Sequence, residues 1–479
     1  MPQNLELLPL LPEIVLSVCG TLVMVLDAAL GNSRKALLGV LALAGIYCAG
    51  VGALLSNQRP GEAFSGMVTV DNAATFFRLL VAVVGFLTVL GSMSYLRRES
   101  LPQGEFYALI LFSLAGQGLM AVASELILLF LGLEISSLAT YVLTGFLRRD
   151  ARSSEAALKY FFLGSFATAF LLYGVALTYG ATGSTRLTAI RQALDKPDTN
   201  LSLVALAAAL LLVGIGFKVS AAPFQVWTPD VYQGAPSPVA GFLSTAPKAA
   251  AFAMLLRVFF IGMPQAAPAW TPMLWILALL SMTVGNFGAL LQTNIKRLLA
   301  YSSIAHAGYV LVAFTARTDH GVTAALVYLA VYGFMNLGAF LVVSHLAGPG
   351  ERYLDLEDYA GLGERQPFLA ALLALFLLSL IGVPLTAGFF GKFYIFRAAV
   401  NAGLIWLAVL GLLNSALAAY YYLKVLVVMY MRAPAPDAPA PEPLPAALAA
   451  TLVISAGATL VLGVRPGRLV DFVQGAAGW

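Results

Sequence analysis

Runs of about twenty consecutive apolar residues dominate this chain and constrain its fold more than any other feature. A helix crosses the hydrocarbon core of a bilayer in about 20 residues, and a spanning helix satisfies its own backbone polar groups there. Charged residues make up only 10% of the 479 residues, against about 25% in an ordinary soluble domain. We therefore predict an all-α integral membrane protein.

The apolar runs predict about 14 transmembrane helices. They lie near residues 7–30, 36–56, 73–96, 105–123, 125–147, 156–180, 201–228, 237–262, 269–291, 298–315, 320–346, 367–402, 404–431 and 444–464. The run 201–228 contains Pro223, and the run 367–402, which is too long for one span at about 1.5 Å per residue, contains Pro384. We predict that each of these two runs forms a discontinuous helix, made of two half-helices joined by an unwound segment.

The spacing of the two interrupted runs predicts an internal repeat. They lie five runs apart, which indicates two five-helix repeats over residues 105–262 and 269–431. An odd number of spans per repeat inverts the second copy, an arrangement found in transporters. We expect one polytopic membrane domain over residues 1–479, with a Pro/Ala-rich linker over 432–443 before the last helix.

Positive charges in the loops predict the orientation. The loops after the odd-numbered spans hold twelve lysines and arginines, and the other side, including the C-terminal tail, holds seven. Because lysine and arginine favour the cytoplasmic side, we expect both termini on the periplasmic side. The Ala/Leu/Gly-rich composition suits a bacterial source, and hence the bacterial inner membrane.

Composition also argues against several kinds of site. The net charge of +4 is spread over many short loops, so no basic face for nucleic acid is expected. Cys19 and Cys48 both lie in apolar runs and form no CxxC pair, and the three histidines are scattered. We expect no metal and no redox cofactor bound to this chain.

Four ionisable residues lie deep in the predicted spans: Glu134, Lys218, Lys248 and Lys392. At about 2.5–3.5 kcal/mol each, they cost roughly 10 kcal/mol together on insertion scales. Buried ion pairs that fix helix packing would explain some of them, but one carboxylate cannot neutralise three lysines. A buried lysine tends to lose its proton, and a nearby carboxylate opposes that loss. The pattern therefore favours proton transfer along a row of lysines.

Other charged residues have simpler explanations. Lys159 follows Glu155 by four residues, so an i,i+4 ion pair explains it as well as a role in proton transfer does. His306 could relay protons, and a hydrogen-bonded core histidine is an equal alternative. Four further cations lie nearer span ends, where long side chains extend to the interface: Arg78, Arg257, Arg397 and Lys424.

Three segments closely resemble the subunit N family of bacterial respiratory complex I. They are KVSAAPFQVWTPDVYQGAPSPVAGFLS (218–244), NIKRLLAYSSIAHAGY (294–309) and GVPLTAGFFGKFYIF (382–396). The resemblance covers essentially the full chain, and WTPDVYQGAP is specific for subunit N among its antiporter-like relatives. It implies a membrane-arm subunit of a NADH:quinone oxidoreductase, a translocase that moves protons while other subunits reduce quinone.

The resemblance also implies partners and residue roles. FMN, iron–sulfur clusters and quinone would lie in partner subunits, and the partners would include neighbouring antiporter-like subunits and membrane lipid. Glu134 would pair with Lys218, Lys248 would be central, and Lys392 would lie towards the periplasmic exit. Lys159 would match a sixth-span lysine of the family.

One position departs from the family pattern. Many relatives carry a histidine where this chain has Gln225, and a carboxamide cannot change charge near neutral pH. Either that histidine is dispensable, or water and the hydrogen bonds of Gln225 suffice; we favour the second. Two rival functions remain: a Mrp-type cation/proton antiporter subunit, which WTPDVYQGAP argues against, and a passive scaffold in the membrane arm.

Overall fold

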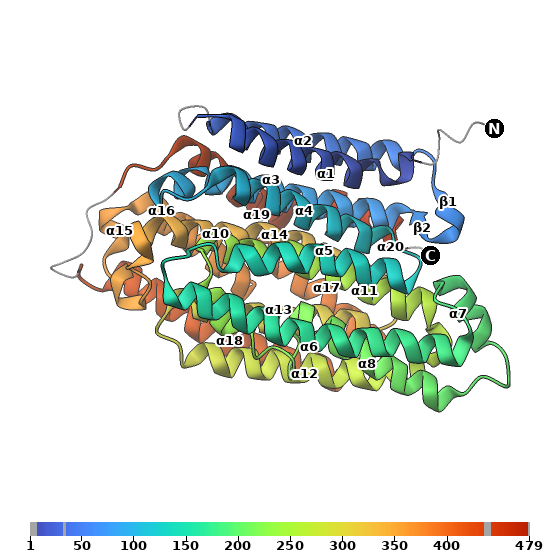
Figure 1. Ribbon diagram of the computed structural model, residues 1–479. Helices are drawn as coiled ribbons and strands as arrows, with labels where there is room; N and C mark the ends of the chain where they lie inside the picture. The colour runs from blue at the N-terminus through green and yellow to red at the C-terminus, as the bar shows by residue number, and fades with distance from the viewer. Residues whose placement is uncertain (1–6, 32–34, 435–441, 478–479) are drawn as a thin grey trace.

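The computed structural model describes residues 7–31, 35–434 and 442–477, and these form a bundle of helices that run side by side (Figure 1). Within them, 13 helical segments are long and apolar enough to cross a membrane. They are α1 (Leu11–Ala29), α2 (Ala36–Ser56), α3 (Asn72–Arg98), α4 (Gln103–Val122), α5 (Leu126–Thr144), α6 (Ala151–Thr182), α8 (Leu201–Val219), the consecutive α10 (Ser237–Leu243), α11 (Ala246–Leu255) and π-helix η5 (Leu256–Gly262), then α12 (Ala267–Leu290), α13 (Ile295–Thr315), α14 (Asp319–Leu346), α18 (Ile405–Met431) and α19 (Ala446–Val464). The predicted all-α membrane fold is confirmed.

Both predicted discontinuous helices are present. The seventh crossing consists of α8 and, after residues 220–227, the short helix α9 (Thr228–Gly234). The twelfth consists of α16 (Pro367–Ile381) and α17 (Ala387–Asn401), each of 15 residues. Neither α16 nor α17 reaches the ~20 residues needed to cross a bilayer alone. These two helices therefore share one crossing.

The helices before these two interruptions, α8 and α16, end in the same backbone motif. At the end of α8, Ser220 takes the left-handed conformation (φ 62°), and the N–H of Ala221 donates to the carbonyl of Gly216 at 2.8 Å. At the end of α16, Gly382 is left-handed (φ 94°), and the N–H of Val383 donates to the carbonyl of Leu378 at 3.1 Å. This is the six-to-one bond of a Schellman cap, which ends a helix abruptly.

A third interruption lies in the eighth crossing and was not predicted from the sequence. α10 ends at Leu243 and α11 begins at Ala246, and Thr245 between them has non-helical angles (φ −123°, ψ −80°). Pro247 cannot donate a backbone hydrogen bond. The hydroxyls of Ser244 and Thr245 both donate to the carbonyl of Gly241, at 2.7 and 2.9 Å.

Polar residues at the N-caps fix where several crossings begin. Each accepts a hydrogen bond from a backbone N–H of the first turn, which has no partner inside the helix. These residues are Asp71, Glu125, Asp150, Asn200, Asn294 and Thr318.

Short elements, also not predicted from the sequence, lie at the ends of the bundle. β1 (Gly61–Ala63) and β2 (Val68–Val70) form an antiparallel hairpin in which Gly61 lies opposite Val70. This hairpin, α7 (Leu187–Leu194) and α20 (Gly467–Ala477) gather at one end of the bundle, and α15 (Leu362–Arg365) lies at the other (Figure 1). The 3-10 turns are η2 (Leu8–Leu10), η4 (Phe64–Gly66), η6 (Pro264–Ala266), η7 (Pro349–Glu351) and η8 (Leu356–Tyr359).

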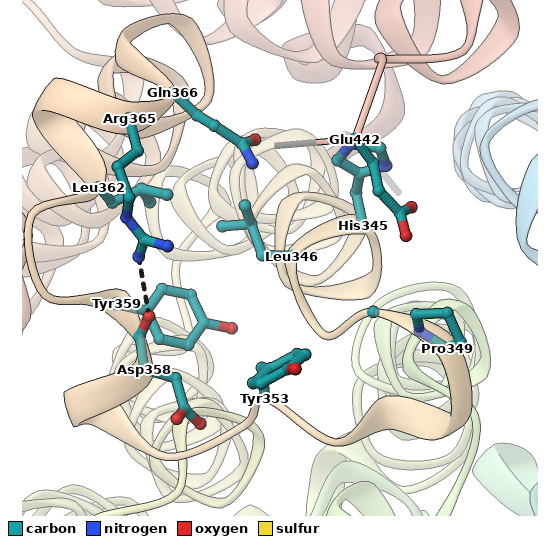
Figure 2. A pocket seen from close by; sticks show the side chains of 11 residues that line it. His345, Leu346, Pro349, Tyr353, Asp358, Tyr359, Leu362, Arg365, Gln366 and Glu442 are labelled. Carbon is teal, nitrogen blue, oxygen red and sulfur yellow. Dashed lines mark hydrogen bonds between the residues drawn. The ribbon is translucent and has the colours of Figure 1, made fainter. Parts of the chain in front are cut away.

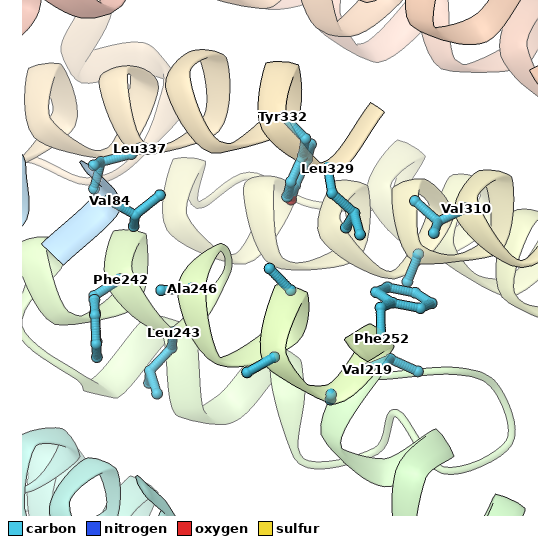
Figure 3. Close-up of a cluster of buried hydrophobic side chains, with 14 of the residues drawn as sticks. Val84, Val219, Phe242, Leu243, Ala246, Phe252, Val310, Leu329, Tyr332 and Leu337 are labelled. Atoms are coloured by element: carbon cyan, nitrogen blue, oxygen red, sulfur yellow. The ribbon is translucent and has the colours of Figure 1, made fainter. Parts of the chain in front are cut away.

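The α10–α11 stretch, α13 and α14 are the most deeply buried crossings, and α1, α6 and α18 are among the most exposed. Figure 3 shows Leu329 and Tyr332 of α14 pointing towards α10 and α11. Leu329 and Tyr332 pack against this crossing, and Asn336 of α14 donates to the Ser244 hydroxyl at the interruption, at 2.7 Å.

Candidate functional site: three buried lysines at helix interruptions

Each of the three lysines singled out in the sequence lies next to one of the helix interruptions. Lys218 is in the last turn of α8, Lys248 is in the first turn of α11, and Lys392 is on α17 after the break from α16. Their exposed fractions are only 8%, 3% and 5%. Among the residues that the structure describes, none of the three has a carboxylate oxygen within 4.0 Å. We refer to Lys218, Lys248 and Lys392 as the three buried lysines.

Aromatic rings enclose the ammonium group of Lys218. The Lys218 nitrogen lies 5.1 Å from the ring centre of Tyr141 and 4.9 Å from that of Tyr160, and it donates to the Tyr160 hydroxyl at 3.3 Å. Tyr160 in turn stacks on Trp227, with ring centres 4.4 Å apart. The Trp227 indole donates to the carbonyl of Phe217 at the end of α8. Trp227 of the WTPD segment therefore supports the Tyr160 ring, and cation–π attraction to the tyrosine rings stabilises a positive charge on Lys218.

Glu134 does not contact Lys218 in this structure. Its carboxylate is half-buried and accepts a hydrogen bond from the Thr168 hydroxyl at 2.8 Å. Tyr141, which faces Lys218, follows Glu134 by seven residues on α5, a rise of about 10 Å. The expected direct pairing of Glu134 with Lys218 is therefore absent here, and the carboxylate is held on α6 instead.

Lys159 forms the predicted ion pair with Glu155, at 2.8 Å. It also pairs with Asp230 at 2.7 Å, and Asp230 pairs with Arg297 at 2.5 Å. Asp230 thus connects α6, α9 and α13. Sequence reasoning missed it, although a carboxylate placed just after an interruption in an apolar run was a usable signal.

Within the described part of the chain, the polar contacts of Lys248 are with neutral groups. Its ammonium donates to the Ser303 carbonyl at 3.3 Å and also hydrogen-bonds to the Ser303 hydroxyl. The ring centre of Tyr232 lies 5.6 Å away. Ser303 therefore connects Lys248 directly to α13.

Polar side chains continue along one face of α13 from Ser303. Residues three or four apart share a helix face, which places Ser303, His306 and Tyr309 in line. His306 hydrogen-bonds through Nδ1 to the Tyr328 hydroxyl at 2.5 Å and through Nε2 to the Tyr422 hydroxyl at 3.1 Å. Both ring nitrogens are engaged, so His306 joins α14 to α18.

Lys392 lies at the far end of this line. Its ammonium is 4.8 Å from the ring centre of Tyr309. It donates to the carbonyls of Leu380 and Ile381, each at 2.9 Å, and to the Ser415 hydroxyl at 2.8 Å. The two carbonyls belong to the last turn of α16, whose carbonyls have no partner within the helix. The negative end of the α16 dipole also favours a cation at this point.

Gln225 lies in the turn after the cis peptide bond between Ala222 and Pro223. Its backbone carbonyl accepts a hydrogen bond from the N–H of Thr228 at 2.9 Å. The carboxamide oxygen is buried and has no hydrogen-bond partner among the described residues. Gln225 is thus a polar group next to the interruption but not in contact with Lys218.

Two arginines correct the expectation that they extend to the membrane interface. Arg78 and Arg257 are each only 3% exposed. Arg78 pairs with Glu13 at 2.7 Å, and Arg257 pairs with Asp71 at 2.5 Å. Glu13 of α1 compensates the charge of Arg78, and Asp71, the N-cap residue of α3, compensates that of Arg257. Neither arginine therefore has to extend to the interface.

A further buried ion pair, also missed in the sequence, holds the start of α10. Lys296 pairs with Glu351 at 2.6 Å, and Glu351 accepts from the N–H of Ser237 at 2.7 Å and from the Tyr95 hydroxyl at 2.8 Å. Burial would raise the pKa of the Glu351 carboxyl, but the Lys296 charge and these hydrogen bonds outweigh burial and lower the pKa.

A separate cavity of about 50 Å³ lies between the end of α14 and residues 353–366. Figure 2 shows Arg365 above it, donating to the Asp358 carbonyl at 3.2 Å. None of the three buried lysines lines this cavity.

Comparisons with known proteins identify the family and the fold of this chain. The family model described as "NADH:quinone oxidoreductase/Mrp antiporter, TM" matches residues 123–418. A protein named NADH-quinone oxidoreductase subunit N 1, from Solibacter usitatus, is 55% identical over 472 residues, covering 98% of this chain and 97% of its own. The subunit N of Trichlorobacter lovleyi is 45% identical over 475 residues, covering 99% and 97%.

Solved structures show the same fold. A chain of respiratory complex I from Thermus thermophilus with bound aureothin matches with a TM-score of 0.83 and 39% identity, covering 98% of this chain and 100% of that one. A chain of the Mrp complex from Dietzia matches with a TM-score of 0.86 at 20% identity, covering 99% and 97%, which establishes a shared fold alone. From the family model and the relatives together, the chain belongs to the subunit N family of NADH-quinone oxidoreductases.

Proposed function

We propose that this chain is a proton-translocating subunit in the membrane arm of a NADH:quinone oxidoreductase and carries out no redox chemistry itself. One observation carries the proposal: buried polar side chains on α13 extend from Ser303, which contacts Lys248, to Tyr309, which contacts Lys392. FMN, iron–sulfur clusters and quinone would lie in partner subunits, among which neighbouring antiporter-like subunits contact this chain. The names of its relatives support this assignment.

In the proposed mechanism, Glu134 moves between two partners. A change that begins at the quinone site would bring the carboxylate from Thr168 towards Lys218, and the nearby negative charge would favour the ammonium form. Return of Glu134 to Thr168 would favour release of the proton. The proton would pass to Lys248 and, by way of His306, on to Lys392.

Lys159 and Gln225 would have secondary roles at the first of these steps. Lys159 is engaged by Glu155 and Asp230, and its release from Asp230 would change the charge balance between α6 and α9. The unpartnered oxygen of Gln225 would hold a water molecule at the interruption. It would thereby replace the histidine of many relatives.

The arrangement in the membrane is part of the proposal. The same cap at the ends of α8 and α16 supports inverted repeats over 105–262 and 269–431. The excess of loop lysine and arginine on one side supports periplasmic termini in a bacterial inner membrane. The predicted 432–443 linker lies in part outside the described residues.

Lys218→Ala and Glu134→Ala in the assembled complex test the proposal. Protons translocated per NADH oxidised would be measured in reconstituted vesicles, with Lys424→Ala on α18 as a control lysine outside the row. We expect both site variants to lower the ratio and the control to preserve it. A normal ratio in both site variants would refute the proposed role.

The rival functions predict different results. A Mrp-type antiporter subunit would purify with small antiporter subunits, whereas the proposed function requires flavin and iron–sulfur proteins in the purified complex. A passive scaffold predicts that the same variants reduce assembly while the complexes that do assemble translocate protons normally.

A further inference from the structure

A groove of about 410 Å³ opens between α17 and α18 on the side of the bundle. Apolar side chains line most of it, and Phe393, Val400 and Leu412 at its edges are half exposed. At its base lie Lys392 and Ser415, the hydrogen-bonded pair of the candidate site. The groove therefore opens from the side of the bundle towards the buried Lys392. The proposed mechanism assigns a role to Lys392 but none to this opening.

The groove matches one leaflet of a bilayer in length. Phe389, Phe393, Phe396 and Val400 line it at intervals of three or four residues, so they share one face of α17. The rise from Phe389 to Val400 is about 16 Å, and half of the hydrocarbon core is about 15 Å thick. A single acyl chain laid along this face would reach from the interface to the middle of the membrane.

A tryptophan marks the interface end of the groove. Trp406, at the start of α18, is 75% exposed, and exposed tryptophan is enriched where the membrane meets water. α17 ends at Asn401, just before this level. Lys392 lies about 14 Å deeper along α17, which places it near the middle of the bilayer.

A cation lies at the depth of the lipid headgroups. Arg397 lies one turn before the end of α17, and its long side chain can extend to the interface. It lines the groove and also a second cavity of about 190 Å³ beside it, which His320 and Gln474 line too. Among the described residues, no aspartate or glutamate lines either cavity, and Arg397 forms no ion pair within 4.0 Å. An exposed guanidinium above an apolar groove is complementary to a phosphate with an acyl chain.

We propose that the groove between α17 and α18 binds an anionic phospholipid, with its phosphate on Arg397 and one acyl chain along Phe389, Phe393 and Leu412. The acyl chain covers Lys392 and Ser415 from the side. It thus keeps water and ions away from the candidate site at its lateral opening. This assignment goes beyond the proposed function, since lipid binding requires no proton transfer.

Photocrosslinking in the intact complex tests the site. The probes are phosphatidylglycerol and phosphatidylcholine, each with a photoreactive group in the acyl chain, and mass spectrometry maps the labelled peptides. We expect phosphatidylglycerol to label residues 389–412 more than phosphatidylcholine does. Arg397→Gln should lower this labelling about tenfold or more, the scale of one lost charged hydrogen bond, and Arg397→Lys should retain most of it.

Two further variants make the result decisive. Arg468→Gln removes another exposed arginine and should leave the labelling unchanged. Leu412→Trp fills the groove, keeps Arg397, and should abolish labelling even if Arg397→Gln fails to assemble. Equal labelling by both probes, full labelling of Arg397→Gln, or crosslinks from α17 to a neighbouring subunit in place of lipid would each overturn the proposal.

Discussion

The Lys296–Glu351 pair yields a quantitative prediction about what keeps α10 in place. The two side chains are 1% and 5% exposed, and their charges lie 2.6 Å apart. Glu351→Met would leave the Lys296 ammonium buried with only the Ala235 carbonyl, 2.5 Å away, as an acceptor. It would also leave the N–H of Ser237 and the Tyr95 hydroxyl without their acceptor.

Removal of one partner from a buried pair costs about 3–5 kcal/mol, because it leaves an uncompensated charge. The double variant Lys296→Met/Glu351→Met leaves no charge, so it should cost less than either single variant. Hydrogen–deuterium exchange of residues 234–246 in the purified complex measures the local opening directly. At about 1.36 kcal/mol per factor of ten, a single variant should exchange roughly two to four orders of magnitude faster.

The double-mutant cycle separates this explanation from loss of packing alone. If packing alone mattered, the costs of the two single variants would add in the double variant. Additive costs, or single variants with wild-type exchange, would refute the account of the charge pair.

Three further predictions concern pH and the candidate site. The pKa of Glu351 is lowered on folding, so its contribution to the stability of the fold is complete above the ordinary value of 4.5. That stability is lost as pH falls through the lower folded value. Thermal melting of the complex should show this loss of stability in acid in the wild type and not in Glu351→Gln. Tyr160→Phe keeps the ring stacked on Trp227 but removes the hydroxyl bonded to Lys218. It should lower protons translocated per electron with normal subunit content, and an unchanged ratio would contradict the assigned contact. Gln225→Ala should lower the same ratio and Gln225→His should preserve it; intact translocation in Gln225→Ala would leave the position without a transfer role.

The crossings and two of the three interruptions could be predicted from the sequence because lipid imposes length and polarity on every span. The third could not. Pro247 lies at the second position of α11, where a proline is tolerated, so the apolar run around it looks continuous. The non-helical backbone at Thr245 becomes visible only in the folded chain.

The charged residues were harder to predict because their partners are remote in sequence. Arg78 and Glu13 are 65 residues apart, and Arg257 and Asp71 are 186 apart. Hydropathy identifies a charge inside a span, but only tertiary packing decides which carboxylate meets it. The separation of Glu134 from Lys218 shows the same limit, since the resemblance implied a pair and the fold places the carboxylate against Thr168.

α13 links three of the sites described above. This one helix contacts Asp230 through Arg297, Lys248 through Ser303 and Lys392 through Tyr309. A slide of α13 by the rise of one residue, about 1.5 Å, would alter all three contacts in the same movement. The surroundings of Asp230, Lys248 and Lys392 would therefore change together, although these three residues lie on three different helices.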